Sequence, residues 1–337
     1  MSARLIDQFE TLIRRDPARR GLIGADDHWG MLCPGHLSAA AADLAAFARR
    51  VAIVTGFYIP RGEPVSAETD GPLGAALLAA ALREVEIDAC LVTDQNCASA
   101  VRAAAEANGL TTDDVWSAPL DRESWVDGFF SDGPGHGLTH LIAIERVGPS
   151  HTPESLQQQP RKGPVPLAEF QSKVSPDDFN HCHNMRGERI DAWTGAMHQL
   201  FEKRPDTPPG MKTVGIGDGG NEIGMGCIPW EELARRLEGE IGAKIPCRIA
   251  TDWNIISGTS NWGGYALAAA VLLLRGETER LRPFDREQQR HALEYLVEHG
   301  PAVDGVTRRR EATVDGLPFL TYIQPWEGIR RLLDFDG

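Results

Sequence analysis

The chain contains a twelve-residue stretch, GIGDGGNEIGMG (residues 215–226), in which six glycines surround acidic and amide side chains. Its glycines fit the G-x-G-x-x-G spacing of a dinucleotide-binding turn, where bare backbone amides attract a pyrophosphate. Here, however, a phosphate would meet the carboxylates of Asp218 and Glu222. Glycine also lets a backbone turn tightly beside a ligand, while Asp218, Asn221 and Glu222 offer oxygens to a divalent cation or an ammonium group. The stretch favours such a site, with a nicotinamide-dependent oxidoreductase as the weaker alternative.

A second group of reactive side chains lies in HCHNMRGE, residues 181–188. Two histidines at alternate positions share one face of an extended segment, as zinc ligands can, but no third soft ligand is within reach in the sequence. We therefore expect His183 to act as a proton shuttle and Arg186 to bind a substrate carboxylate. The structural alternative is that polar residues of this segment cap and begin a helix over 187–203.

Two further polar stretches, ETDGP and SGTSNWGG, each precede an alanine-rich apolar segment. In the first, Asp70 suits a helix N-cap, which leaves Glu68 as the freer candidate for binding a substrate. In the second, Ser260 and Asn261 are candidates for binding a substrate, and the backbone amides around them could hold a carboxylate or an oxyanion. Their structural alternative is again to cap the helix that follows.

The elements that must position these side chains alternate between short β-rich apolar runs and longer alanine- and leucine-rich segments. We expect strands at 50–57, 87–94, 138–147, 211–218 and 246–252, and helices at 71–84, 97–108, 261–276 and 285–299. This alternation predicts an α/β protein, with a three-layer, doubly wound, mostly parallel sheet and helices on both faces.

Acidic residues follow nearly every expected strand. Ligands of open α/β sheets bind beyond the carboxyl ends of the strands, so these acids are expected to converge at one edge. They are Glu68, Asp70, Asp94, Glu145, Asp218, Glu222 and Asp252.

We expect one α/β domain over residues 1–337. It begins with an amphipathic helix at 1–20 and ends with a helical tail at 285–337. Six prolines interrupt the strand–helix rhythm at about 148–185, which predicts a proline-rich insertion or lid.

The composition argues against several classes of function. The chain has 34 Lys and Arg against 48 Asp and Glu, and the resulting charge of −14 disfavours binding to nucleic acid or to anionic membranes. No apolar run reaches the roughly 18–20 residues that cross a bilayer. The six cysteines form no C-x-x-C pair, which favours a reduced cytosol or matrix, and we expect a cytoplasmic location. The oligomeric state stays open between a monomer and a homo-oligomer.

Several stretches together resemble the D-glutamate cyclase family, in particular the C-terminal domain of its mitochondrial members and stand-alone bacterial relatives. They are VTGFYIPRGEPVSAETDGPLGA, LIAIERVGPSH, HCHNMRGE, GIGDGGNEIGMG and SNWGGYALAAA. The resemblance implies a lyase that converts D-glutamate, a small acidic amino acid, to 5-oxo-D-proline with loss of water. Because the mitochondrial members carry a further N-terminal domain, a non-catalytic module that binds an amino acid or a metal is the alternative.

Lactam closure needs a deprotonated amine, an activated γ-carboxyl group and a stabilised oxyanion. Glu145, Glu222 or His183 could act as the base, since the free amine is mostly protonated at neutral pH. A divalent cation, Mg²⁺ or Mn²⁺, held by Asp218, Glu222 and Asp252 would polarise the carboxyl group. Otherwise we expect no cofactor.

Overall fold

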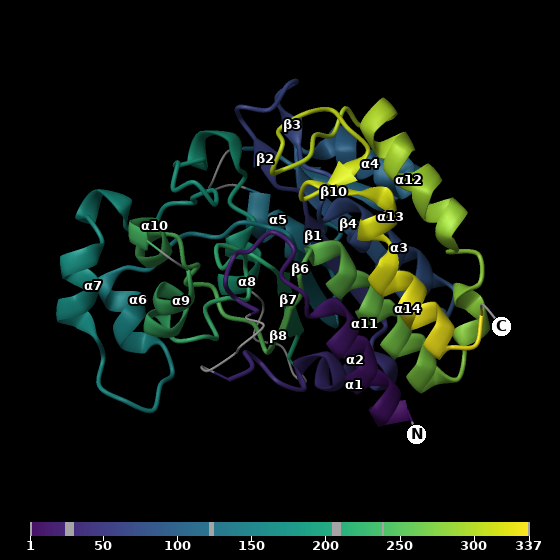
Figure 1. The fold of residues 1–337 in the computed structure, drawn as a ribbon, viewed down its shortest axis with the longest axis horizontal. Coiled ribbons are helices and arrows are strands. Elements are labelled where there is room, and N and C mark those ends of the chain that lie inside the picture. Colours follow the sequence, from purple (N-terminus) through teal and green to yellow (C-terminus); the bar gives the residue numbers. More distant parts are fainter. Residues whose placement is uncertain (1, 24–29, 121–124, 204–209, 238, 336–337) are drawn as a thin grey trace.

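A six-stranded parallel sheet forms the centre of the fold (Figure 1). The computed structural model describes residues 2–23, 30–120, 125–203, 210–237 and 239–335, so residue 1 and residues 336–337 of the predicted terminal segments lie outside it. In spatial order the strands are β5 (Val115–Ala118), β4 (Asp88–Asp94), β1 (Arg50–Thr55), β6 (His140–Ile144), β7 (Lys212–Gly217) and β8 (Trp253–Ile256).

The chain runs outward from β1 to β5, returns to the other side of β1 at β6, and then runs outward to β8. Strand order therefore reverses between β1 and β6, which are paired in parallel with Val51 opposite His140. In a doubly wound sheet, this reversal opens a crevice at the carboxyl ends of the two strands. The predicted fold class is confirmed.

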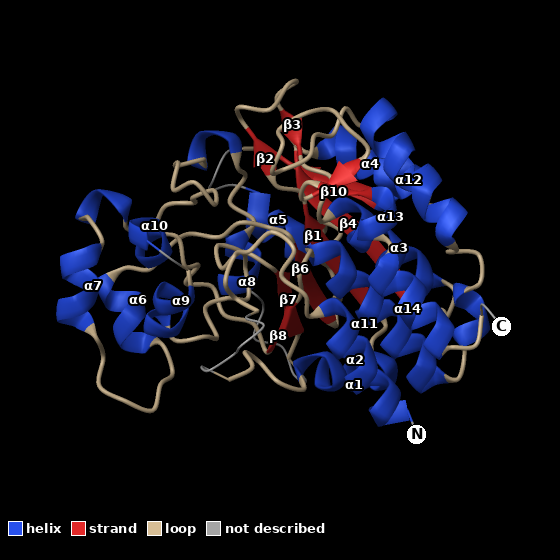
Figure 2. Cartoon of the chain, viewed as in Figure 1, coloured by secondary structure: helices blue, strands red, loops and turns tan. Residues whose placement is uncertain are grey.

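Helices cover both faces of the sheet (Figure 2). Successive residues of a strand point to opposite faces, and in β1 Ile53 belongs to one apolar cluster while Ala52 belongs to another. The first cluster receives α1 (Ser2–Ile13), α2 (His36–Phe47), α3 (Pro72–Arg83), α4 (Ala98–Ala107) and α11 (Ser260–Arg275). The second receives α5 (Trp125–Ser131), α8 (His198–Glu202) and α9 (Trp230–Arg236).

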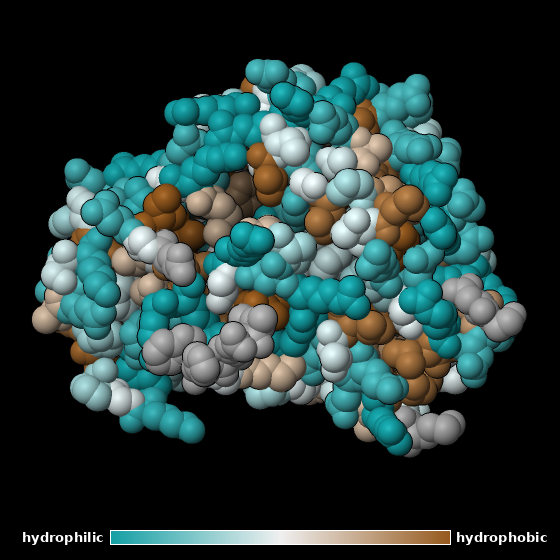
Figure 3. All heavy atoms as spheres, in the orientation of Figure 1, coloured by the Kyte–Doolittle hydropathy of each residue, from teal (hydrophilic) through white to brown (hydrophobic). Residues whose placement is uncertain are grey.

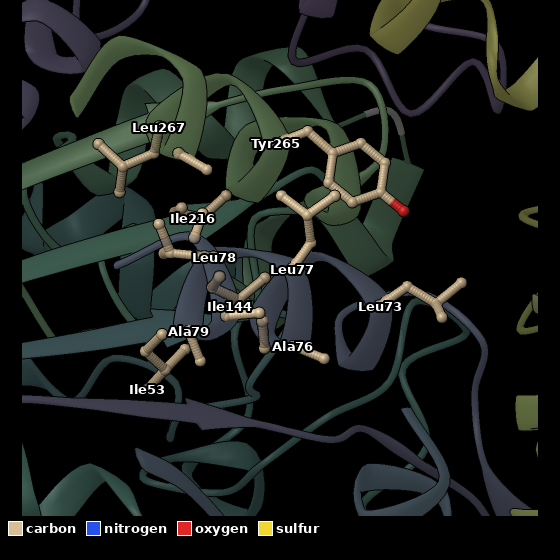
Figure 4. Packing of buried hydrophobic residues seen from close by; sticks show 14 of the residues in the cluster. Ile53, Leu73, Ala76, Leu77, Leu78, Ala79, Ile144, Ile216, Tyr265 and Leu267 are labelled. Atoms are coloured by element: carbon tan, nitrogen blue, oxygen red, sulfur yellow. The ribbon is translucent and has the colours of Figure 1, made fainter. Parts of the chain in front are cut away.

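The alanine-rich sequence of α3 lets it pack closely against both the sheet and α11 (Figure 4). All of its residues except the last are buried. Figure 4 shows Leu77 and Leu78 of this helix among Ile144 and Ile216 of the sheet and Tyr265 of α11. Small alanine side chains allow this close approach, which places the N-termini of α3 and α11 near each other.

The proline-rich excursion forms a small lobe beside the sheet with two later helices (Figure 1). It contains α6 (Pro153–Gln158) and α7 (Leu167–Lys173), which pack with α9 and α10 (Gly239–Lys244). Phe170 and Trp230, 5.1 Å apart between ring centroids, lie in the lobe's own apolar core.

The C-terminal residues form an outer layer over α4, α1 and α11. This layer includes α12 (Arg286–His299), α13 (Phe319–Tyr322) and α14 (Gln324–Leu332). Two short hairpins complete the described fold: β2 (Tyr58–Ile59) with β3 (Ser66–Ala67), and β9 (Thr313–Val314) with β10 (Leu317–Pro318). Among the helices that the structure describes, none has both the length and the apolar character that a membrane crossing needs.

The predicted strand at 246–252 is wrong, because the sixth strand begins only at Trp253. Most of the predicted segment pairs with loops: Cys247 N donates to Gly220 O, and Arg248 N to Pro149 O. Asp252 comes immediately before β8, and its carboxylate accepts bonds of 2.8 Å from both N and Oγ1 of Thr213, near the start of β7. Asp252 therefore lies at the starting edge of the sheet.

The predicted helix over 187–203 is also wrong for most of its length, since only α8 and a 3₁₀ turn at Asp191–Trp193 form there. Asn184 Oδ1 accepts the backbone N–H groups of Arg186 and Glu188, at 2.9 and 3.0 Å. This side chain closes a tight loop that competes with helix formation.

Candidate functional site

Glu145 follows β6 at the point where strand order reverses. Its φ of 45° lies in the left-handed region, which non-glycine residues rarely adopt and which is concentrated at functional sites. Gly71, with a φ of 95°, allows this placement, because a Cβ at that position would lie 2.6 Å from the Cβ of Glu145. The backbone therefore brings the end of β6 and the start of α3 into direct contact.

The N-termini of α3 and α11 cap each other across this contact. The Asp70 carboxylate accepts the backbone N–H groups of Ser260 (2.7 Å) and Asn261 (2.9 Å) at the start of α11. In return, Asn261 Oδ1 accepts the N–H groups of Gly71 (2.9 Å) and Gly74 (2.7 Å) at the start of α3. Asp70 is thus a helix cap, as predicted, but for α11 rather than for the helix that it precedes. Two helix N-termini, each with a partial positive charge, meet beside the acids.

The glycine-rich turn wraps around one of its own side chains. Glu222 is fully buried, and its carboxylate accepts the backbone N–H groups of Asp218 (3.0 Å), Gly219 (2.6 Å) and Gly220 (2.7 Å). These amides are the donors that a pyrophosphate would use in a dinucleotide-binding turn. An internal carboxylate occupies them here, so the turn holds Asp218 at the end of β7.

Three carboxylates meet at the carboxyl edge of the sheet. Asp70, Glu145 and Asp218 are all buried, and one oxygen atom from each lies within 4.8 Å of the others. Ser260 Oγ donates a 2.5 Å hydrogen bond to Glu145 Oε2. We call Asp70, Glu145 and Asp218 the acid cluster. Its donor chemistry is that of a site for an ammonium group or a hard divalent cation.

Arg20, from the segment after α1, is the counter-ion of this cluster. Its guanidinium group forms ion pairs with Asp218 and, at 2.7 Å, with Asp315, and its side chain is only 14% exposed. Burial lowers the pKa of Arg20, but the carboxylates of the cluster and of Asp315 outweigh this and raise the pKa above its ordinary value. Arg20 therefore remains charged inside the site.

The carboxyl groups of the site hold protons more tightly than ordinary acids do. Burial is the largest cause of the raised pKa values of Glu145 and Asp218, and neighbouring carboxylates raise them further. Burial and Asp315 raise the pKa of Asp70 to about 7, against the hydrogen bonds from α11. Glu68 is buried beside the cluster, and burial together with the charge of Glu145 raises its pKa as well. Of these groups, Asp70 can therefore accept and return a proton near neutral pH.

A cavity of about 590 Å³ is lined by Glu68, Glu145 and Arg20, among others. Its size is typical of small-molecule sites, which span about 300–1,000 Å³. Although the chain is strongly acidic, six arginines line this cavity: Arg19, Arg20, Arg61, Arg186, Arg236 and Arg308. Figure 3 shows a mostly hydrophilic outer face with small apolar patches. The cavity thus concentrates positive charge where an anionic substrate would enter.

Two of these arginines lie close together. Arg186, predicted to bind a substrate carboxylate, donates to Val306 O at 3.1 Å. Burial and the nearby charge of Arg308 lower the pKa of Arg186. Arg308 itself has a buried Nε without a hydrogen-bond partner. Two neighbouring guanidinium groups, one of them with an unpaired N–H donor, are suited to bind one anion between them.

Other predicted site residues lie apart from the acid cluster or bind the backbone. His183 is buried with its Nε2 atom 3.5 Å from Asp178, and burial and the charge of Lys244 lower its pKa. Asn221 Nδ2 donates to His183 O at 2.8 Å and so ties this loop to the glycine-rich turn. Asp252 lies beside the start of β7, whereas Asp218 follows its end. At about 3.3 Å per residue the two are separated by roughly 16 Å.

The sequence reasoning missed Arg20 and Asp315. Both lie outside the strand ends that guided the search, and the hydrogen bond that joins them spans 295 positions. Asp70 was expected among the acids that follow the strands, but its role was interpreted as that of a helix cap. The position that favours a role at the site is that it follows β1, one of the two strands at which the order reverses.

Comparisons with known proteins agree with the resemblance seen in the sequence. A family model described as D-glutamate cyclase-like, C-terminal, matches residues 9–156 and 173–330. The unmatched residues between these ranges lie in the proline-rich excursion. The human protein named mitochondrial D-glutamate cyclase is 29% identical over 357 aligned residues, which cover 98% of this chain and 51% of that protein. The chain spans about half the length of this relative, and its own predicted cytoplasmic location stays a prediction.

Proposed function

Because the chain belongs to the D-glutamate cyclase-like family, we propose that it is a lyase that cyclises D-glutamate to 5-oxo-D-proline with loss of water. The observation that supports this reaction is the acid cluster: three buried carboxyl groups with raised pKa values beside a cavity of small-molecule size. The remaining question is whether such a site suits lactam closure.

The proton balance of the reaction matches this chemistry. D-glutamate enters with a protonated amine and two carboxylates, and the product retains one carboxylate and one lactam N–H. Two protons must therefore move from nitrogen to one γ-carboxyl oxygen, which leaves as water, and no proton is gained or lost overall. A buried carboxyl group whose pKa is raised above its ordinary value can take each proton from nitrogen and pass it to the departing oxygen.

We assign the proton transfers to Glu145, because it lies on the cavity and its strained backbone holds it at the strand end. Ser260 Oγ orients its carboxyl group. The other two acids of the cluster would bind the substrate ammonium, and Arg186 with Arg308 would bind the α-carboxylate. Glu68 lies on the same cavity and would contact the substrate.

The acid cluster also fits a divalent cation by its donor chemistry. Asp70, Glu145 and Asp218 would hold it, because their oxygen atoms lie close together. The predicted set of Asp218, Glu222 and Asp252 does not meet at one point, since Asp252 lies at the opposite edge of the sheet. When bound, the cation would polarise the γ-carboxyl group. Arg20 supplies positive charge to the same carboxylates.

The direct test is incubation of the purified chain with D-glutamate or L-glutamate, with Mn²⁺ or with EDTA, while 5-oxoproline is followed by NMR and its configuration by chiral chromatography. We expect 5-oxo-D-proline from D-glutamate, and a loss of about 10²–10⁴-fold in rate for Glu145→Gln. EDTA separates metal-assisted from metal-free cyclisation.

Asp252→Asn is the matched control, because it makes the same acid-to-amide change at the opposite edge of the sheet. It should leave the rate within about twofold, since surface changes away from a site have small effects. Binding of D-glutamate without any product would instead support the non-catalytic binding module. Full activity in a folded Glu145→Gln protein would refute the assigned role.

A further inference from the structure

Two cysteines far apart in the sequence lie in contact next to the C-terminal end of the glycine-rich turn. The Sγ atoms of Cys33 and Cys227 are 3.7 Å apart, although the residues are separated by 194 positions. Both thiols are free and both residues are partly exposed. Formation of a disulfide would need an approach to about 2.05 Å, which small side-chain movements can provide.

Cys33 belongs to the connection between α1 and α2, whose described residues, 14–23 and 30–35, we call the strap. The strap carries Arg20 to the acid cluster. Arg236 of α9 donates to the strap at Leu22 O (3.3 Å) and Gly30 O (2.5 Å). Cys227 follows the glycine-rich turn. The contact between the two thiols therefore lies near the C-terminal end of the strap, whereas Arg20 contacts Asp218 nearer to its start.

The surroundings of the two thiols favour exchange at Cys33. The hydrogen bond between the two thiols lowers the pKa of Cys33, burial opposes this, and the charge of Arg14 lowers it further. The same hydrogen bond and burial raise the pKa of Cys227. By contrast, burial raises the pKa of Cys90, another partly exposed cysteine, to about 11. Cys90 therefore offers an internal comparison.

We propose that Cys33 and Cys227 are a modification site at which a reversible disulfide fastens the strap, with Arg20, over the acid cluster. With a disulfide oxidant such as oxidised glutathione, the Cys33 thiolate attacks one glutathione sulfur and releases one glutathione thiol. Cys227 then attacks Cys33 Sγ and releases the second. Two electrons pass from the protein to the oxidant, and the two thiol protons end on the two released glutathione thiols.

The test treats the full chain with oxidised glutathione and maps its peptides without reduction. We expect one cross-linked peptide containing Cys33 and Cys227, loss of two titratable thiols per chain, and recovery of both with dithiothreitol. Cys33→Ser and Cys227→Ser should each abolish the cross-link, whereas Cys90→Ser should retain it. Glutathione adducts alone, or a cross-link through another cysteine, would overturn the proposal.

A second measurement tests the fastening of the strap. Trypsin cleaves after arginine, and Arg19 is exposed beside the partly buried Arg20. Cleavage at these residues should become about tenfold slower after oxidation, because it tracks the population of the open strap. Oxidised Cys33→Ser should be cleaved as fast as its reduced form. A cross-linked wild-type chain cleaved at an unchanged rate would refute the fastening, and the test requires no cyclase activity.

Discussion

Replacement of Asp70 by asparagine tests whether the site holds a proton near neutral pH. Burial, the charge of Asp315 and the other nearby acids raise the pKa of Asp70, while bonds from Asn261 N and Ser260 N and the charge of Arg20 lower it, with a result of about 7. Asparagine keeps the shape of the side chain but cannot ionise. Its amide group faces one backbone donor of α11, at a cost of about 1–3 kcal/mol that does not vary with pH.

The pH dependence of the free energy of unfolding separates the loss of a titrating carboxyl group from the constant cost of the asparagine amide. A carboxyl group whose pKa is raised by folding binds more protons in the folded state, so it contributes most stability below its ordinary pKa of 3.8 and loses this contribution as pH rises through about 7. At roughly 1.4 kcal/mol per pH unit, the whole change is about 4 kcal/mol, of which about 2 kcal/mol falls between pH 5.5 and 7. The Asp70→Asn protein cannot ionise at this position, so its free energy of unfolding does not show this decrease.

The assay is equilibrium unfolding in urea for both proteins at a series of pH values from about 5.5 to 8.5. The free energy of unfolding of the wild type should fall relative to that of Asp70→Asn by about 2 kcal/mol up to pH 7 and level off above about pH 8. The other carboxyl groups titrate in both proteins. Most of their contribution therefore cancels when the two free energies of unfolding are subtracted. Parallel profiles would show that Asp70 is ionised throughout, and proton transfer within the cluster would then lose its basis.

Two further substitutions probe how the site is held. Gly71→Ala should lower the free energy of unfolding by about 2–4 kcal/mol and reduce cyclisation, because the residue has a φ of 95° and its new Cβ would meet Glu145. An unchanged thermal unfolding temperature would contradict this. Asn261→Ala should lower the free energy of unfolding by about 2–3 kcal/mol, since the N–H groups of Gly71 and Gly74 lose their acceptor. A urea midpoint equal to that of the wild type would show that water replaces the Asn261 side chain as the acceptor.

The sequence predicted the elements that local patterns determine. Apolar β-rich runs located β1, β4, β6 and β7, and alanine-rich runs located α3, α4 and α11. The rule that ligands bind at the carboxyl ends of parallel strands then brought Glu145 and Asp218 together as candidates, and they do lie together. For these two acids, local pattern and topology were sufficient.

The rule gave a wrong position for Asp252, because the apolar run at 246–252 pairs with loops and the strand begins after it. A shift of the strand moved this acid from one edge of the sheet to the other. Arg20 and Asp315 could not be predicted, since their contacts join distant parts of the chain and neither residue lies at an expected strand end. Such pairings are set by tertiary packing rather than by local propensity.

The glycine-rich turn shows how one backbone motif can suit either an anionic or a cationic ligand. In a nucleotide site, the amides of such a turn are left free for phosphate. Here the carboxyl group of Glu222 accepts these amides from within the turn, and the carboxyl group of Asp218 lies beyond it. An incoming phosphate would be repelled, whereas a cation would find oxygens already aligned. The N-termini of α3 and α11 and the charge of Arg20 offset the repulsion among the acids, which explains how a group of buried carboxyl side chains can persist at this edge of the sheet.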